Sequence, residues 1–165
     1  HVFSLGFLGA TSILVGQALG SGDMAGMKAV RRTSTKVMLL ASCPILLAFL
    51  FLGEEIAVAY SIDGDTETIW LQICYCLLVL KLFDDLALAG QGFLVGIEHT
   101  RTVFLGRMAG LWLIAMPMGY LLSTQYNALG YWIGFAMGTA LTLLWYVRAA
   151  TTYWARHNPE LIVKR

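Results

Sequence analysis

Residues 68–95 read TIWLQICYCLLVLKLFDDLALAGQGFLV, an apolar run of helical length with charged residues near its middle. A hydrocarbon core of about 30 Å needs about 20 helical residues, so this stretch is long enough to cross a membrane. The charged residues are Lys81, Asp84 and Asp85. A charge near the bilayer centre costs about 2.5–3.5 kcal/mol on insertion scales, so three together indicate internal partners or a water-filled cavity.

The composition of the whole chain also favours a lipid bilayer as its surroundings. Hydrophobic residues make up 58% of the 165 positions and charged residues 13%, and the mean hydropathy is +0.71. A soluble domain is usually about half apolar and about a quarter charged. The net charge of +1 gives no reason to expect a nucleic-acid partner. We find no nucleotide-binding loop, zinc-ligand spacing or nucleophile motif, so we expect neither an enzyme nor a cofactor.

Five apolar stretches are long enough to cross a membrane as helices. They are Val2–Leu19, Val37–Gly53, Thr68–Val95, Val103–Ser123 and Leu129–Val147. Pro44 and Pro117 lie within two of them and predict kinks, because proline removes a backbone hydrogen bond. Glycines four residues apart recur along the chain and predict close helix contacts. The predicted fold class is an all-α, polytopic transmembrane helical bundle of about five spans.

Charged residues in the connections predict the orientation of these spans. Ten of the 11 Lys and Arg residues fall on one side of the five-span arrangement, and the exception is Lys81. The connection after the second span carries only acidic charges, namely Glu54, Glu55, Asp63, Asp65 and Glu67. Because Lys- and Arg-rich loops stay in the cytoplasm, we expect an external N-terminus and a cytoplasmic C-terminus.

The charged cluster of the third span is the candidate functional site. Lys81 precedes Asp84 by three residues and Asp85 by four, so on a helix it can reach either carboxylate. One interpretation is a self-neutralising pair that only lets the helix insert. A single lysine leaves one carboxylate unmatched, and such a group is by default a proton or cation site. We expect Lys81 and Asp85 to neutralise each other and Asp84 to bind the cation.

Other polar residues are weaker candidates. Gln91 lies seven residues after Asp84, on roughly the same helix face, and is predicted either to line a cavity or to belong to a packed interface. Asp23 is expected to cap the second helix, and Glu98 and His99 to be solvated at a helix end. The cysteines, Cys43, Cys74 and Cys76, lie in apolar runs and are expected to act as small hydrophobic residues, so no metal site is predicted.

Four motifs occur in an order that resembles the MATE (multidrug and toxic compound extrusion) family, in particular its NorM-like members. They are VGQALGSGD at 15–23, the element from FDD at 83–85 to GFLVGIEHTR at 92–101, MPMGY at 116–120 and GYWIG at 130–134. The match spans essentially the whole chain. Leu14, Val95 and His99 depart from the residues that are usual in this family.

The resemblance implies a twelve-helix antiporter of two lobes, of which this chain covers helices eight to twelve. Residues 1–150 then form part of the C-terminal lobe, residues 151–165 form a cytoplasmic tail, and the N-terminal lobe is missing. The implied activity is export of small organic cations or drugs across the cell inner membrane in exchange for Na⁺ or H⁺, with Asp84 in the position of a cation-binding carboxylate. The alternatives are a lipid or oligosaccharide flippase of the same superfamily and a non-transporting membrane subunit.

Overall fold

The computed structural model describes residues 2–61 and 64–157, which form helices joined by short turns. The elements are α1 (Val2–Gly20), α2 (Met24–Phe51), α3 (Gly53–Ala59), α4 (Asp65–Gly96), α5 (Thr100–Met108), the π-helical segment η1 (Ala109–Ala115) and α6 (Met116–His157). The backbone of α6 breaks at Asn127, where φ is 51° and ψ is −133°. No strand occurs in the described ranges, and the all-α prediction is confirmed.

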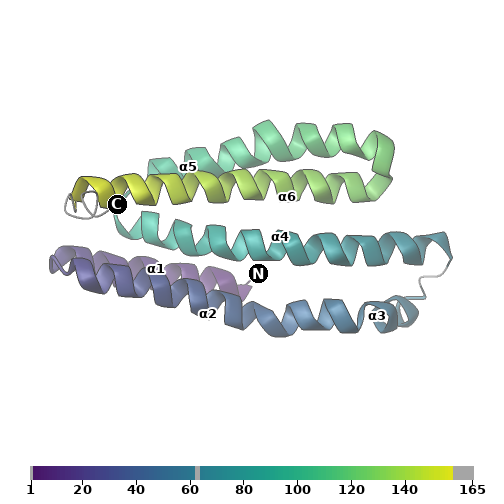
Figure 1. Ribbon diagram of the computed structural model, residues 1–165, viewed down its shortest axis with the longest axis horizontal. Coiled ribbons are helices and arrows are strands. Elements are labelled where there is room, and N and C mark those ends of the chain that lie inside the picture. Colours follow the sequence, from purple (N-terminus) through teal and green to yellow (C-terminus); the bar gives the residue numbers. More distant parts are fainter. Residues whose placement is uncertain (1, 62–63, 158–165) are drawn as a thin grey trace, which may run out of the picture.

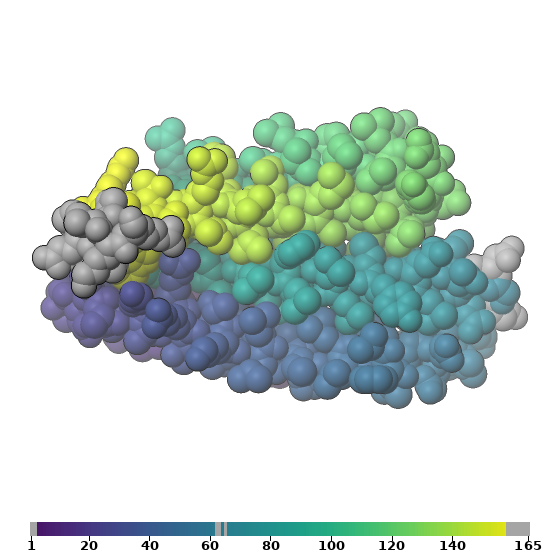
Figure 2. Space-filling view, in the orientation of Figure 1, coloured from purple at the N-terminus to yellow at the C-terminus, as the bar shows by residue number. Residues whose placement is uncertain are grey.

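The long helices lie side by side along one axis, with α4 between two groups (Figure 1). On one side α1 packs against α2, and on the other α5, η1 and α6 form a hairpin that turns back at Asn127. Within the described ranges, α4 alone has Cα atoms within 8 Å of both groups. The side chains of α4 fill the layer between the groups (Figure 2). The helix with the buried charges is therefore the structural link of the bundle.

The second predicted span begins too late, because α2 starts at Met24 rather than Val37. The Asp23 side chain accepts a hydrogen bond of 2.8 Å from the backbone N–H of Gly26, as the capping prediction requires. Residues 28–36, which carry the basic run, lie on the first turns of α2 rather than in a loop. The basic residues still gather at the end of the bundle where α1, α4 and α6 end and α2 and α5 begin (Figure 1). We call this the basic end.

The structure adds further details to the sequence-based expectations. The acidic connection contains the short helix α3, and α6 continues to His157, so residues 151–157 are helical. Residues 158–165, Asp63 and the chain's first residue lie outside the described residues. Before Pro117 the chain is π-helical, with the Met116 N–H donating to the Leu111 carbonyl. At Pro44 the helix α2 continues without a break.

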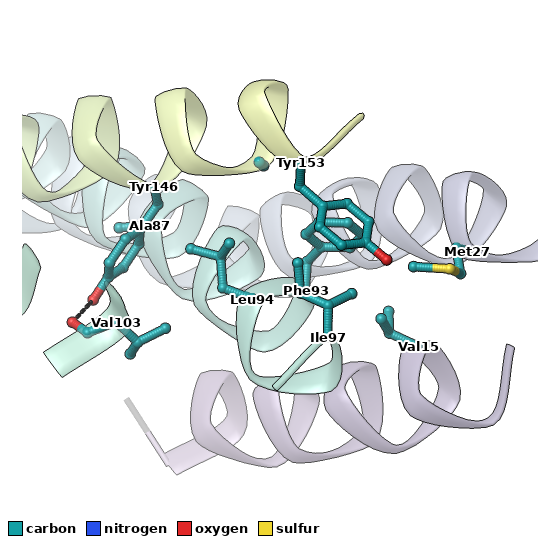
Figure 3. Close-up of a cluster of buried hydrophobic side chains, with 10 residues drawn as sticks. Val15, Met27, Ala87, Phe93, Leu94, Ile97, Val103, Tyr146 and Tyr153 are labelled. Carbon is teal, nitrogen blue, oxygen red and sulfur yellow. Dashed lines mark hydrogen bonds between the residues drawn. The ribbon is translucent and has the colours of Figure 1, made fainter. Parts of the chain in front are cut away.

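A buried core lies near the basic end (Figure 3). Val15 of α1, Met27 of α2 and Phe93 of α4 are fully buried there, and Tyr153 of α6 is 7% exposed. The Phe93 ring stacks on Trp154 with 5.7 Å between ring centroids. Aromatic rings bury large areas and prefer such offset or edge contacts, so this cluster joins all the long helices firmly at one end.

The outer surface of the bundle is apolar. Large hydrophobic residues on every long helix are exposed, among them Phe3 on α1, Leu40 on α2, Tyr75 on α4 and Leu113 in η1. By length and hydropathy, the described part of the chain has three helical stretches able to cross a membrane: Phe3–Gly20, Met24–Phe51 and Thr100–His157. The last of these contains two spans, because Asn127 reverses its direction. An apolar exterior on a helical bundle is what lipid contact requires.

Glycines form the contact between the two arms of the α5–α6 hairpin. A methyl group on Gly134 would lie 2.3 Å from the backbone nitrogen of Gly119, and one on Gly138 would lie 2.4 Å from the carbonyl oxygen of Gly110. The obstacles are backbone atoms, which a rotamer change cannot move aside. Close helix contacts at glycines were predicted from their spacing, and the structure confirms them here.

We predict that Gly134→Ala destabilises the full-length protein by about 1–3 kcal/mol, because the added methyl group forces the hairpin arms apart. Gly9→Ala is the matched control, since a methyl group there meets nothing within 4 Å. Thermal unfolding in detergent measures both variants. Equal melting temperatures for Gly134→Ala and the control would contradict the hairpin contact.

Candidate functional site

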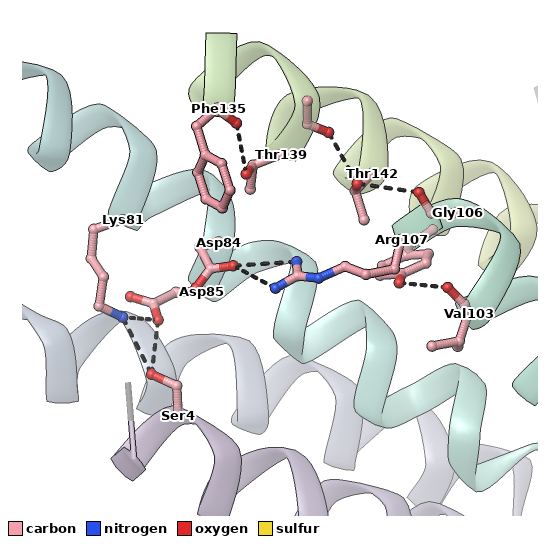
Figure 4. A network of polar contacts seen from close by, with 12 residues as sticks. Ser4, Lys81, Asp84, Asp85, Val103, Gly106, Arg107, Phe135, Thr139 and Thr142 are labelled. Carbon is pink, nitrogen blue, oxygen red and sulfur yellow. Dashed lines mark hydrogen bonds and ion pairs between the residues drawn. The ribbon is translucent and has the colours of Figure 1, made fainter. Parts of the chain in front are cut away.

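The middle of α4 presents two neighbouring carboxylates to opposite groups of helices (Figure 4). Successive helical residues are rotated by about 100°, so adjacent side chains point in different directions. Asp85 points toward α1 and α2, and Asp84 points toward α5. Asp85 is 0% exposed and Asp84 5% exposed. Each carboxylate therefore depends on its own protein partners for neutralisation.

Asp85 is held by three donors from three helices. The Lys81 ammonium, one turn earlier on α4, forms an ion pair with Asp85 Oδ1. Ser4 of α1 donates to the same oxygen at 3.1 Å and accepts from the Lys81 Nζ at 3.2 Å. Ser42 of α2 donates to Asp85 Oδ2. A buried charge stabilises a fold only when its hydrogen bonds are met, and here both oxygens have donors.

Asp84 has a looser partner on the next helix. Both terminal nitrogens of Arg107 on α5 lie 3.4 Å from Asp84 Oδ1. This exceeds the usual range of about 2.7–3.2 Å for an N–H···O hydrogen bond. The Arg107 side chain is 36% exposed, against 8% for the Asp84 side chain. Screening by solvent weakens such a pair, so Arg107 is held less firmly than Lys81.

The geometry confirms one expected pairing and corrects another. Lys81 pairs with Asp85, as the sequence predicted. The expectation that Asp84 lacks a matching charge is wrong, because Arg107 reaches it from α5. Arg107 was counted with the basic residues of the connections, although the predicted span Val103–Ser123 includes it, and in the structure it lies two turns into α5. Its position inside the predicted span Val103–Ser123 was the available sequence signal.

Small cavities adjoin both charged pairs. One of about 20 Å³ lies beside Arg107 and is walled by Gly110, Gly138, Thr139 and Thr142. A larger apolar cavity, of about 200 Å³, lies between α2 and α4 with Lys81 at its edge. The first has the size and hydroxyl groups that one water molecule needs.

Gln91 is half-buried on α4 and lines neither of these two cavities, so its predicted lining role stays a prediction. Glu98 and His99 are exposed, as expected for a helix end. Within the described residues, no group of three His, Cys, Asp or Glu side chains is placed to hold a metal ion. Cys43, Cys74 and Cys76 are free thiols.

An apolar helical bundle that buries neutralised carboxylates in the middle of its central helix is a polytopic membrane protein. The MatE family model matches residues 1–121 of the 165, and the chain belongs to this family. No solved structure matches the chain significantly.

Curated relatives cover almost the whole chain. It is 27% identical to "Multidrug resistance protein MdtK" of Photorhabdus laumondii over 98% of the chain and 36% of that relative. For MdtK of Yersinia pseudotuberculosis serotype O:1b the identity is 31%, over 93% of the chain and 35% of the relative. "Probable multidrug resistance protein NorM" of Photorhabdus laumondii is 29% identical over 81% of the chain and 31% of its own length. The chain therefore spans about a third of the relatives it matches.

We predict that breaking the Lys81–Asp85 pair on one side destabilises the protein more than removing both charges. Asp85→Leu leaves the Lys81 ammonium, whose side chain is 18% exposed, with the Ser4 hydroxyl as its remaining partner among the described residues, and loss of one member of a buried pair costs about 3–5 kcal/mol. Lys81→Leu with Asp85→Leu leaves no buried charge at this position. Thermal unfolding of the full-length variants in detergent gives the comparison. A double variant less stable than Asp85→Leu would refute this account of the pair.

Proposed function

We propose that this chain is part of a secondary-active antiporter that exports small organic cations in exchange for Na⁺ or H⁺, with Asp84 as the coupling carboxylate. The observation that carries the proposal is the placement of Asp84, which is 5% exposed in the middle of α4, the one helix of the described ranges that contacts both helix groups. A carboxylate at this depth favours a bound cation or proton. The relatives' printed names, multidrug resistance proteins, support the substrate class.

Coupling needs a group whose occupancy changes the balance between two conformations. A ligand shifts such a balance only by its difference in affinity for the two states. Asp84 meets the condition because it lies on α4, while its partner Arg107 lies on α5. Cation binding at Asp84 alters the attraction between these helices. The same α4 packs against α1 and α2, so the change reaches the other helix group.

The remaining parts of the transporter follow from family membership and charge. The relatives are about three times as long, and we assign the missing length to the helices of a first lobe, which together with this lobe encloses the substrate. The basic end faces the cytoplasm of a cell with an inner membrane, since basic residues resist translocation. That orientation also places the C-terminus inside. The substrate pathway lies between the lobes and needs no cofactor.

The geometry at Lys81 weighs against the alternatives. A flippase for anionic lipids needs a basic cavity, but the Lys81 charge is matched by Asp85. A membrane subunit that docks a partner helix through this pair needs Asp85 to be accessible, and Asp85 is 0% exposed with its hydrogen bonds made inside the chain. Neither alternative function gives a role to the buried Asp84 carboxylate.

We predict that Asp84→Asn in the full-length protein abolishes efflux driven by a Na⁺ or H⁺ gradient, because the neutral amide neither takes up a proton nor offers a negative charge to Na⁺. The variant with Lys81→Leu and Asp85→Leu is expected to keep most of its efflux, since its lost charges neutralise each other. Export of a fluorescent organic cation from proteoliposomes measures both. Full activity of Asp84→Asn together with an inactive double variant would assign coupling to Asp85 instead.

A further inference from the structure

Each buried carboxylate of α4 has a cation of its own, but the two cations are tethered differently. Lys81 belongs to the same helix as Asp85, so this ion pair cannot separate when helices move against each other. Arg107 belongs to α5 and reaches Asp84 across a helix contact. The Asp85 pair also has Ser4 and Ser42 as donors, whereas the Arg107 nitrogens lie 3.4 Å from the Asp84 oxygen. The first pair is built to stay closed and the second is able to open.

The surroundings of Arg107 offer its guanidinium group other hydrogen-bond acceptors than Asp84. The side chain is 36% exposed and lines the cavity of about 20 Å³ whose walls include the hydroxyl-bearing residues Thr139 and Thr142 of α6. The Thr142 hydroxyl donates hydrogen bonds to the carbonyl oxygens of Gly106 and Gly138. Water or hydroxyl oxygen in this space can accept from a guanidinium that has left Asp84.

The backbone next to Arg107 has a shape that allows a change of register. The π-helical segment η1 begins at Ala109, two residues after Arg107. A π-helical turn contains one residue more than an α-helical turn, so its loss or gain rotates the preceding α5 relative to α6. Short π-helical segments recur at functional sites. Rotation of α5 moves Arg107 away from Asp84.

We propose that Arg107 is a tethered cation that occupies Asp84 until the coupling cation displaces it. The inference rests on the proposed function, in which Asp84 binds that cation. Bound Arg107 competes with Na⁺ or H⁺ for the same carboxylate and therefore weakens its apparent cation affinity. In return, the site is never left as a bare buried charge during the transport cycle, which would be costly. Arg107 is thus a specificity-determining and positioning residue, and its role differs from that of the Lys81–Asp85 ion pair, which stays closed.

The other charged and titratable groups around Asp84 do not replace Arg107 in this role. On α4 the nearby charges are Lys81 and Asp85, which neutralise each other. Tyr146 of α6 donates its hydroxyl to the Val103 carbonyl and is fully buried. Of these groups, Arg107 is the one that pairs with Asp84, so its removal changes the charge seen by the coupling cation.

The test compares Arg107→Gln, Arg107→Lys, Asp84→Asn and the control Arg101→Gln in the full-length protein reconstituted in proteoliposomes. Arg101 is an exposed residue of the same helix, so its substitution makes the same charge change away from the site. The quantity measured is the Na⁺ or H⁺ concentration that drives half-maximal efflux of a fluorescent organic cation. We expect Arg107→Gln to lower it about fivefold or more, the change that loss of a partly exposed competing ion pair produces. Arg107→Lys, which keeps the competing charge, and Arg101→Gln should stay near the parent value.

The outcomes separate the two proposals. An unchanged or higher half-maximal concentration in Arg107→Gln, while Asp84→Asn is inactive, would overturn the tethered-cation inference and leave the coupling role of Asp84 intact. Cation-driven efflux that persists in Asp84→Asn would overturn both. If Arg107→Gln is too unstable to reconstitute, Arg107→Met is measured instead, because its unbranched apolar chain preserves packing. A fivefold gain in that variant supports the inference and no gain refutes it.

Discussion

The neutralisation of two carboxylates buried side by side on α4 is the constraint on which the bundle depends. In an apolar interior an unmatched charge is too costly to keep, so each carboxylate requires a donor from its own side of the helix. Asp85 draws Ser4 and Ser42 toward α4 and thereby ties α1 and α2 to it. Asp84 attracts Arg107 and with it α5. The chemistry of the candidate site and the packing of the helices are the same set of contacts.

In this arrangement some contacts of the lobe hold the helices in place, and another contact is able to change. The aromatic core at the basic end and the glycine contacts of the α5–α6 hairpin are tight and apolar, and they hold the helices at fixed distances. The Asp84–Arg107 contact is longer, partly exposed and next to a π-helical segment. A protein interior that is close-packed changes by switching between discrete arrangements. A long, partly exposed polar contact on the central helix is where such a switch is easy to drive.

Local sequence patterns predicted part of this structure and missed the rest for physical reasons. The Lys81–Asp85 pair follows from a spacing of four on one helix, and the cap at Asp23 from its own side chain. The contact between Asp84 and Arg107 joins residues 23 apart on different helices, so the helical periodicity of the sequence does not predict it. The polar first turns of α2 and the short α3 were read as loops, because hydropathy marks the lipid-facing length of a helix and not its ends.

The central claim is that Asp84 exchanges its cation whereas Asp85 keeps its own. Infrared difference spectra of the full-length protein, recorded with and without the driving cation, report carboxylates whose environment changes. The account predicts one carboxylate band that is lost in Asp84→Asn and retained when Lys81 and Asp85 are both replaced by leucine. A band that survives Asp84→Asn and vanishes in the leucine double variant would contradict it.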